Sequence, residues 1–276
     1  MKLMTIIGNR PQAMKVDTSL KQYLVWTGQH HDKNMKDIFL RELGIKLDYD
    51  LSRRNYNPKN TGSYKLMLLG EMIDACVNVI GRANPTHVMV YGDTNSTLAG
   101  AIAAKQCGKK LIHVEAGCRS YNMEMKEEQN RRMVDQISDV LLCPSERAMD
   151  ILNEEKVMGE IGLCGNVMLD TCFAQLPTDE KILKKYKLKK KKYLLLTMHR
   201  AETVDDKQAL EEVVEALGDI TKPILFPMHP RTKKRLEEFK ISLPDNVQVI
   251  EPVGYKEMIN LIGFAEKVLT DSGGIQ

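Results

Sequence analysis

Short apolar runs alternate along the chain with longer stretches whose apolar residues recur at helical spacing. The apolar runs that we predict to be strands are 2–8, 23–27, 87–91, 110–114, 140–143, 161–164, 193–197, 224–227, 247–250 and 267–270. The stretches that we predict to be helices are 33–43, 61–81, 96–106, 127–137, 145–154, 206–217, 232–239 and 255–264. Several strands are apolar on both faces, which is typical of parallel sheets covered by helices. The alternation therefore predicts an α/β fold with doubly wound sheets.

A lysine-rich stretch divides this pattern into two Rossmann-like domains. We predict an N-terminal domain over 1–176, a solvated linker over 177–192 and a C-terminal domain over 193–276. Two such domains facing each other would form a cleft, and ligands of open α/β sheets bind beyond the carboxyl ends of the strands. The last predicted strand leads into Ser272-Gly273-Gly274 and two further residues, so we expect the second domain to be incomplete.

Composition and charge argue against nucleic acid, membrane and metal ions as partners. Lys and Arg total 40 while Asp and Glu total 37, and a net charge of +3 gives little attraction for polyanions. No run approaches the roughly 18 apolar residues of a membrane span, and the N-terminus lacks the features of a signal peptide. The six cysteines form no CxxC pair, so we interpret them as free thiols of a cytoplasmic protein.

Charged side chains follow the predicted strands of the first domain. Arg10 and Lys15 flank the expected start of a helix, where two cations and free N–H groups could hold a diphosphate. Asp93 and Glu115 each follow an apolar strand, where a carboxylate could point into a cleft. Ordinary alternatives stay open: the cations could lie on the surface, Asp93 could cap a helix, and Glu115 could form a buried ion pair with Arg119.

The second domain places a different set of polar groups after its strands. His199 and Arg200 follow one predicted strand and His229 follows the next, although His199 could also be a core histidine. The segment Ser272-Gly273-Gly274 offers a hydroxyl group and bare backbone amides that suit phosphate. Together with the first domain, these groups suit a nucleotide diphosphate with acid–base chemistry beside it. Neither GxGxxG nor GxxxxGK[ST] occurs, so neither a dinucleotide cofactor nor a P-loop nucleotide site is predicted.

Seven segments, in order, resemble the non-hydrolysing UDP-N-acetylglucosamine 2-epimerases, whose fold is related to that of the GT-B-like nucleotide-sugar glycosyltransferases. The segments are 8–12 (GNRPQ), 27–30 (TGQH), 92–97 (GDTNST), 113–119 (HVEAGCR), 127–131 (EEQNR), 199–202 (HRAE) and 270–276 (TDSGGIQ). The resemblance implies inversion at C2 of the sugar without a redox cofactor. UDP would be eliminated across C1–C2, leaving a 2-acetamidoglycal, and would add back with a proton on the other face of C2.

The resemblance also implies roles for individual residues. Asp93, Glu115 and Glu127 match the catalytic carboxylates of the family by position, and His199 matches its essential histidine. Which carboxylate removes the C2 proton is left open. The residues that we expect to contact the substrate are Arg10, Lys15, Arg131, Arg200, His229, Ser272, Gly273 and Gly274. A homodimer is expected for the full-length form.

Some details of the sequence point to a branch of the family, and others depart from its pattern. Segments such as 229–232 (HPRT) look like the enzymes that act on UDP-2,3-diacetamido-2,3-dideoxy-glucuronic acid, although UDP-N-acetylglucosamine stays the main expectation. The stretch 16–26 is shorter than the family requires, so one edge of the first domain could be distorted, and Lys126 stands where proline is usual. The rival interpretations are a glycosyltransferase, a hydrolysing epimerase and an inactive nucleotide-sugar binding module.

Overall fold

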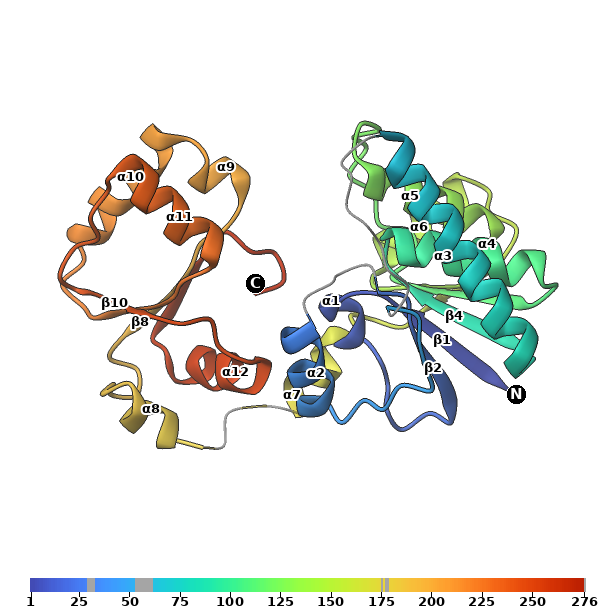
Figure 1. Ribbon diagram of the computed structural model, residues 1–276, viewed down its shortest axis with the longest axis horizontal. Helices are drawn as coiled ribbons and strands as arrows, with labels where there is room; N and C mark the ends of the chain where they lie inside the picture. The colour runs from blue at the N-terminus through green and yellow to red at the C-terminus, as the bar shows by residue number, and fades with distance from the viewer. Residues whose placement is uncertain (29–32, 53–61, 175, 177–178, 276) are drawn as a thin grey trace. The chain divides into compact units, whose positions relative to one another are not determined.

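The computed structural model describes residues 1–28, 33–52, 62–174, 176 and 179–275 (Figure 1). It divides into two compact units, Met1–Thr171 and Cys172–Gln276. The division falls within helix α7 (Met168–Ala174), ahead of the boundary predicted at 176. Parts of the resembling segment 27–30, of the predicted helix 61–81 and of the predicted linker lie outside the described residues.

The first unit is built on a parallel seven-stranded sheet in the order β3-β2-β1-β4-β5-β6-β7. Its strands are β1 (Leu3–Ile7), β2 (Gln22–Trp26), β3 (Tyr49–Asp50), β4 (His87–Tyr91), β5 (Lys110–Val114), β6 (Val140–Cys143) and β7 (Glu160–Leu163). Its helices include α1 (Arg10–Ala13), α2 (Lys33–Glu42), α3 (Gly62–Ala83), α4 (Asn95–Gln106), α5 (Lys126–Ile137) and α6 (Glu146–Glu154). The strand order reverses between β1 and β4, and ligands of such sheets bind at this switch point.

Helices pack closely on the central strands of this sheet. All five residues of β1 are buried, and one core cluster joins Met4 and Ile6 of β1 to Ile80 of α3. Helix α4 approaches the sheet so closely that a methyl group added at Gly100 would lie 3.0 Å from a side chain of β4. Because α4 is held in this way, the loop that precedes it, which carries Asp93, has a fixed position on the sheet.

The connection from β1 to β2 is short, and the helix within it is correspondingly short. Helix α1 has four residues, Arg10–Ala13. Strand β2 nevertheless pairs with β1 along its whole length, from Leu3 opposite Gln22 to Ile7 opposite Trp26. This strand pairing is therefore intact, and the departure of stretch 16–26 from the family pattern leaves the strand in register.

The second unit contains a parallel four-stranded sheet in the order β10-β9-β8-β11. Its strands are β8 (Leu194–Thr197), β9 (Ile224–Pro227), β10 (Val247–Ile250) and β11 (Lys267–Thr270). Its helices include α8 (Lys181–Lys185), α9 (Ala201–Val204), α10 (Lys207–Gly218), α11 (Pro230–Phe239) and α12 (Tyr255–Phe264). Helices α10 and α11 lie over one face of the sheet and α12 over the other, each with its own core cluster (Figure 1).

The lysine-rich segment packs against the second unit. Leu183 of α8 and Tyr193 are buried in the cluster beneath α12, and the Tyr193 hydroxyl donates a hydrogen bond to the carbonyl of Leu261 at 2.5 Å. On the surface, Lys185 pairs with Glu257 at 2.5 Å. The lysines thus lie on and beside a short helix whose apolar side chain helps to close the core, whereas the pattern predicted a solvated linker.

Candidate active site

In the first unit, four charged side chains lie where β1, β4 and β5 end. The Lys15 ammonium forms an ion pair with Glu115, and the Arg131 guanidinium forms one with Asp93. The cations are the more buried partners, with Lys15 10% and Arg131 15% exposed, while Glu115 is 38% and Asp93 29% exposed. The structure therefore brings these four predicted residues to one end of the sheet and leaves both carboxylates open to a ligand.

The two carboxylates belong to one cluster. A methyl group added at Gly92 would lie 3.4 Å from Glu115 Oε2 and 3.7 Å from Lys15 Nζ, so Glu115 reaches the residue that precedes Asp93. Burial raises the pKa of Asp93; the positive charge of Arg131 opposes this rise, and the negative charge of Glu115 adds to it. A carboxyl group with a raised pKa holds its proton at higher pH, which suits general acid–base catalysis.

The two ordinary interpretations of these carboxylates are wrong. The N-cap of α4 is Thr94, whose side chain accepts a hydrogen bond from the backbone N–H of Thr97, so Asp93 does not cap this helix. The Arg119 guanidinium is used elsewhere: it contacts Asp135 at 2.7 Å and Glu155 at 2.6 Å. Glu115 and Asp93 are thus oriented by their own cations, Lys15 and Arg131.

At the start of α5, two adjacent glutamates have opposite environments. Glu127 is exposed on the first turn. Glu128 is buried; it accepts hydrogen bonds from Ser120 N–H at 2.7 Å and from Arg132 Nε at 2.8 Å. Burial opposes ionisation of Glu128, but these donors prevail and lower its pKa to about 2. Glu128 therefore anchors the helix as a permanent carboxylate, and Glu127 is the one that a ligand can reach.

Arg10 and Lys15 occupy different environments at the end of β1. Arg10 is exposed at the first position of α1, whose N-cap Asn9 accepts a hydrogen bond from Gln12 N–H. A helix of four residues has almost no macrodipole, so Arg10 itself is the main attraction for an anion here. Lys15 is already paired with Glu115. A bound diphosphate would have to share this lysine with the carboxylate.

A buried glutamine that the sequence did not single out links the loops of this site. Gln12 is 2% exposed, and its side-chain oxygen accepts a hydrogen bond from Gly8 N–H at 2.7 Å. Its amide nitrogen donates to the carbonyl of Tyr91 at 2.7 Å and to Thr97 Oγ1 at 2.9 Å. Gln12 therefore ties the loop after β1 to the loop after β4. The available sequence signal was a polar residue between two cations in an otherwise apolar turn.

In the second unit, one carboxylate organises the end of β8. Asp271 Oδ2 accepts hydrogen bonds from the backbone N–H groups of His199 and Arg200, both at 2.8 Å. The ring nitrogen Nδ1 of His199 lies 3.6 Å from Asp271 Oδ1. Burial opposes ionisation of Asp271, but these backbone donors and the nearby His199 lower its pKa. Asp271 therefore positions the predicted histidine and arginine. From the sequence it was known only as the residue that precedes the predicted phosphate loop.

The two predicted histidines of this unit lie side by side. The ring centroids of His199 and His229 are 5.4 Å apart, and their planes are inclined by 34°. His229 is also the N-cap of α11, with its Nδ1 accepting a hydrogen bond from Arg231 N–H at 3.1 Å. His199 is 42% exposed and thus lies at the surface of this unit, which excludes the core-histidine interpretation.

The loop after β11 lies beside Arg200. Ser272 N–H donates a hydrogen bond to Thr270 Oγ1 at 2.9 Å, while Gly273 and Gly274 are exposed. A methyl group added at Gly273 would lie 3.8 Å from a guanidinium nitrogen of Arg200. A cation next to exposed glycine backbone is an arrangement that can hold phosphate. The structure thus brings Arg200 and the predicted phosphate loop together.

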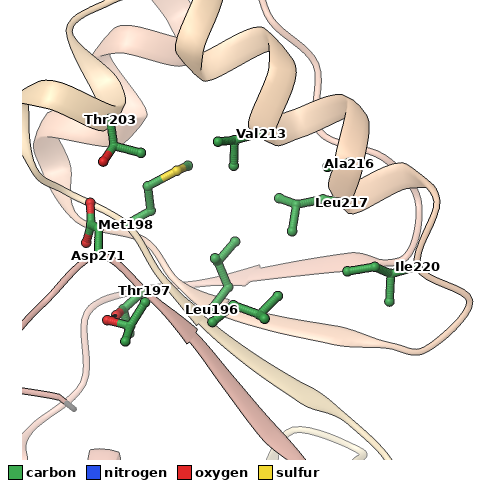
Figure 2. A pocket seen from close by; sticks show the side chains of 11 residues that line it. Leu196, Thr197, Met198, Thr203, Val213, Ala216, Leu217, Ile220 and Asp271 are labelled. Carbon is green, nitrogen blue, oxygen red and sulfur yellow. Dashed lines mark hydrogen bonds between the residues drawn. The ribbon is translucent and has the colours of Figure 1, made fainter.

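A cavity of about 380 Å³ adjoins this end of the second sheet (Figure 2). Its walls are mainly apolar. They include Leu196 of β8 and Met198, which follows this strand, together with Val213 and Leu217 of α10. Figure 2 shows Asp271 near Met198 at one end of the cavity. None of the described residues that line it is a lysine, arginine or histidine, so these walls supply none of the cations that a diphosphate needs.

Among the described residues, no group of three or more His, Cys, Asp or Glu side chains is arranged to hold a metal ion. Across the same residues, no helix combines the length and the apolar character that crossing a bilayer requires.

Comparison with known proteins gives a consistent family. The family model described as UDP-N-acetylglucosamine 2-epimerase matches residues 12–276. A UDP-N-acetylglucosamine 2-epimerase homolog of Methanococcus maripaludis is 41% identical over 100% of this chain and 80% of its own length. The UDP-2,3-diacetamido-2,3-dideoxy-D-glucuronate 2-epimerase of Pseudomonas aeruginosa is 42% identical over 100% of this chain and 79% of its own length.

Solved structures agree with the sequence matches. The UDP-N-acetylglucosamine 2-epimerase of Methanocaldococcus jannaschii, solved in complex with UDP-N-acetylglucosamine and UDP, is 37% identical and superposes with a TM-score of 0.81, covering 100% of this chain and 80% of that one. The corresponding enzyme of Neisseria meningitidis, solved with UDP-N-acetylglucosamine bound, gives a TM-score of 0.84 at 27% identity, covering 100% of this chain and 79% of that one. The matching family model and these relatives show that this chain belongs to the UDP-N-acetylglucosamine 2-epimerase family.

Proposed function

We propose that this chain inverts C2 of a UDP-linked 2-acetamido sugar, converting UDP-N-acetylglucosamine to UDP-N-acetylmannosamine. The observation that carries the proposal is the pair of accessible carboxylates, Asp93 and Glu115, each held by its own cation at the switch point of the first sheet. Inversion at a carbon needs a group that removes a proton from one face and a group that returns one to the other. Two neighbouring carboxyl groups with different environments supply such a pair.

The reaction follows from what these groups can exchange. A carboxylate takes the proton from C2, the C1–O bond to UDP breaks, and a C1=C2 double bond forms, leaving a 2-acetamidoglycal and UDP. UDP then adds back to C1 while a carboxyl group delivers a proton to the opposite face of C2. The raised pKa of Asp93 favours its role as a proton carrier. Glu127, exposed on α5, is the third candidate carboxylate, and the proposal leaves open which of the three removes the proton.

UDP leaves as an anion, so its departure requires positive charge and N–H donors around the diphosphate. In the second unit, Arg200 next to the exposed Gly273 and Gly274 supports this role, and His199 beside Asp271 supports protonation or orientation of the leaving group. The residues that we propose to contact the substrate are Arg10, Lys15, Arg131, Arg200, His229, Ser272, Gly273 and Gly274.

A second candidate substrate is UDP-2,3-diacetamido-2,3-dideoxy-glucuronic acid. It is favoured by the 42% identity with the Pseudomonas aeruginosa enzyme that is named for this sugar. Both substrates carry the 2-acetamido group and the UDP on which the proposed chemistry depends. The sugars differ at C3 and C6, so the two functions are distinguished by substrate preference and share one mechanism.

Incubation with each UDP-sugar in deuterated water tests the proposal. Deuterium at C2 of a sugar that is still linked to UDP, together with formation of the C2 epimer, is the expected result by NMR. Net release of UDP with free sugar would instead indicate a hydrolysing epimerase, and transfer to an acceptor would indicate a glycosyltransferase. UDP binding without any exchange would leave a nucleotide-sugar binding module and contradict the proposal.

We also propose that the protein is a cytoplasmic homodimer. Support for a dimer comes from exposed apolar side chains before and on α5, namely Tyr121, Met123, Met125 and Met133. Support for a reducing compartment comes from the six cysteines, which are all free. Light scattering at micromolar concentration tests the dimer, and a monomer mass across the concentration range would contradict it.

A further inference from the structure

Behind the paired carboxylates of the first unit lies a buried ionic network that the proposed chemistry does not use. His113, in β5, is fully buried, and its Nδ1 lies 2.7 Å from Asp135 Oδ1 while its Nε2 lies 2.7 Å from the carbonyl oxygen of Gly92. Asp135, also fully buried on α5, contacts Arg119 at 2.7 Å through its other oxygen. This same oxygen accepts a hydrogen bond from Gly117 N–H at 3.3 Å.

The contacts define what each group of this network does. The carbonyl of Gly92 can only accept a hydrogen bond, so His113 Nε2 must donate to it. Burial opposes ionisation of Asp135, but hydrogen bonds and charge from His113 and Arg119 prevail and lower its pKa. Asp135 is therefore ionised, and His113, which contacts it through Nδ1, is a rigid bridge from α5 to the loop after β4.

The network holds the backbone on which the two carboxylates stand. Gly92 directly precedes Asp93, and Gly117 follows Glu115 by two positions. Gly92, Glu115 and Gly117 all have positive φ angles, of 62°, 70° and 78°. For Glu115, which has a Cβ atom, this left-handed conformation is strained and persists only where surrounding contacts hold it. Hydrogen bonds from His113 to Gly92 and from Gly117 to Asp135 are contacts of that kind.

We propose that His113 and Asp135 are positioning residues that set the placement of the Asp93 carboxylate relative to that of Glu115. The inference rests on the proposed function, because it concerns the same two carboxylates. It adds residues that do not touch the substrate and act through the main chain. A misplacement of about 1 Å at a reacting group can reduce the rate about 100-fold, so a buried hydrogen bond to the neighbouring carbonyl has a direct consequence for catalysis.

Two substitutions of His113 separate its two contacts. In His113→Asn the side-chain amide nitrogen stands near the position of Nδ1, so the contact with Asp135 is kept and the contact with Gly92 is lost. In His113→Gln the amide nitrogen stands near the position of Nε2 and keeps the donor to Gly92. We expect His113→Asn to lower kcat for C2 exchange roughly 10- to 100-fold with KM unchanged, and His113→Gln to restore most of the rate.

The control is Val134→Ala, which removes buried side-chain volume at the residue that precedes Asp135 on α5, in the core cluster shared with α3 and α4. It should lower the melting temperature without changing kcat. If His113→Asn keeps the wild-type kcat, or if the two His113 variants lose activity equally, the positioning role is overturned. Loss of activity in Val134→Ala to the same degree would also overturn it, because any destabilisation would then produce the effect.

A second measurement separates this inference from the proposed function. The pKa of the Asp93 carboxyl group, followed by NMR through the chemical shift of its carboxyl carbon, reports the surroundings of this group without any turnover. In the wild type the Asp93 midpoint should lie above the ordinary range, as burial requires; it should move in His113→Asn and return in His113→Gln. Absence of C2 exchange in the wild type would contradict the proposed function. The positioning role would then be overturned by an Asp93 titration midpoint that is the same in the wild type and in both His113 variants.

Discussion

At the carboxyl end of the first sheet, two carboxylates are held in ion pairs by largely buried cations, whereas at the carboxyl end of the second sheet the predicted arginine and histidines are exposed or partly exposed. In the first unit, Lys15 holds Glu115 and Arg131 holds Asp93, with cations that are 10% and 15% exposed. In the second unit, Arg200 and His229 are exposed and His199 is 42% exposed. Asp271 orients this second group mainly through backbone N–H groups.

The difference corresponds to two kinds of task. Acid–base groups must hold a fixed position and a tuned pKa before the substrate arrives, which burial and ion pairs provide. Groups that bind a diphosphate must offer unoccupied donors and exposed backbone, which glycines and a solvent-facing arginine provide. The carboxyl end of the first sheet is therefore suited to acid–base chemistry, and that of the second sheet to holding the leaving group. Four experiments can test this division.

The largest effect is expected from Asp93→Asn and Glu115→Gln. Each removes a proton-transfer group while keeping the side-chain shape, so C2 exchange should fall about 100- to 10,000-fold with UDP affinity retained. Deuterium exchange followed by NMR and calorimetric titration with UDP measure the two quantities. Glu146→Gln, at the exposed start of α6, is the matched control. Wild-type exchange in both variants would remove these carboxylates from the mechanism.

Next in size is the contrast between Gly8→Ala and Gly273→Ala. A methyl group at Gly8 would lie 1.8 Å from Ser96 Oγ and 2.4 Å from Thr27 Oγ1, which form a buried hydrogen bond, so we expect a loss of about 3 kcal/mol of stability. At Gly273 the nearest atom is 3.8 Å away, and stability should not change. Urea unfolding measures both. Equal losses of stability would contradict the view that the carboxyl end of the first sheet is closely packed and that of the second sheet is open.

A smaller effect separates the adjacent glutamates of α5. Glu128→Gln should cost about 2 kcal/mol of unfolding free energy at pH 7, because the buried carboxylate loses charged hydrogen bonds. The folded pKa of Glu128, about 2, is below its ordinary value, so its contribution is complete above about pH 4.5 and disappears as the pH falls towards 2. The difference between wild type and Glu128→Gln should therefore shrink at low pH.

Glu127→Gln is the control for this experiment, since Glu127 is exposed at the neighbouring position. It should leave the unfolding free energy unchanged at every pH and lower the rate of C2 exchange. The reverse outcome, a stability loss in Glu127→Gln and a rate loss in Glu128→Gln, would exchange the roles that burial assigns to the two residues.

The smallest effect is expected in the second unit, from Asp271→Asn. The amide keeps one oxygen for the N–H groups of His199 and Arg200 but lacks the charge that strengthens these bonds. We expect UDP to bind roughly tenfold more weakly, which corresponds to about 1.4 kcal/mol. Calorimetric titration with UDP measures this, with Asp219→Asn at the C-terminal end of α10 as the control. Unchanged UDP affinity would separate Asp271 from the binding of the diphosphate.

Hydrophobic periodicity was enough to predict most of the elements. Strands such as β4 and β5 are apolar on both faces, and helix α10 carries an apolar stripe, so local sequence specifies them. The short elements β3, α7 and α9 were not predicted, because two to seven residues contain too little periodicity. Tertiary contacts stabilise such short elements.

The sequence by itself determined which polar residues follow strands, because strand ends are readable from the apolar pattern; Asp93, Glu115 and His199 were identified in this way. Only the tertiary structure decided their partners. Lys15 meets Glu115 and Arg131 meets Asp93 across long sequence separations, and no local pattern encodes such pairs. It also decided which of Glu127 and Glu128 is buried, because a helix turns by about 100° per residue and its orientation on the sheet is set by packing.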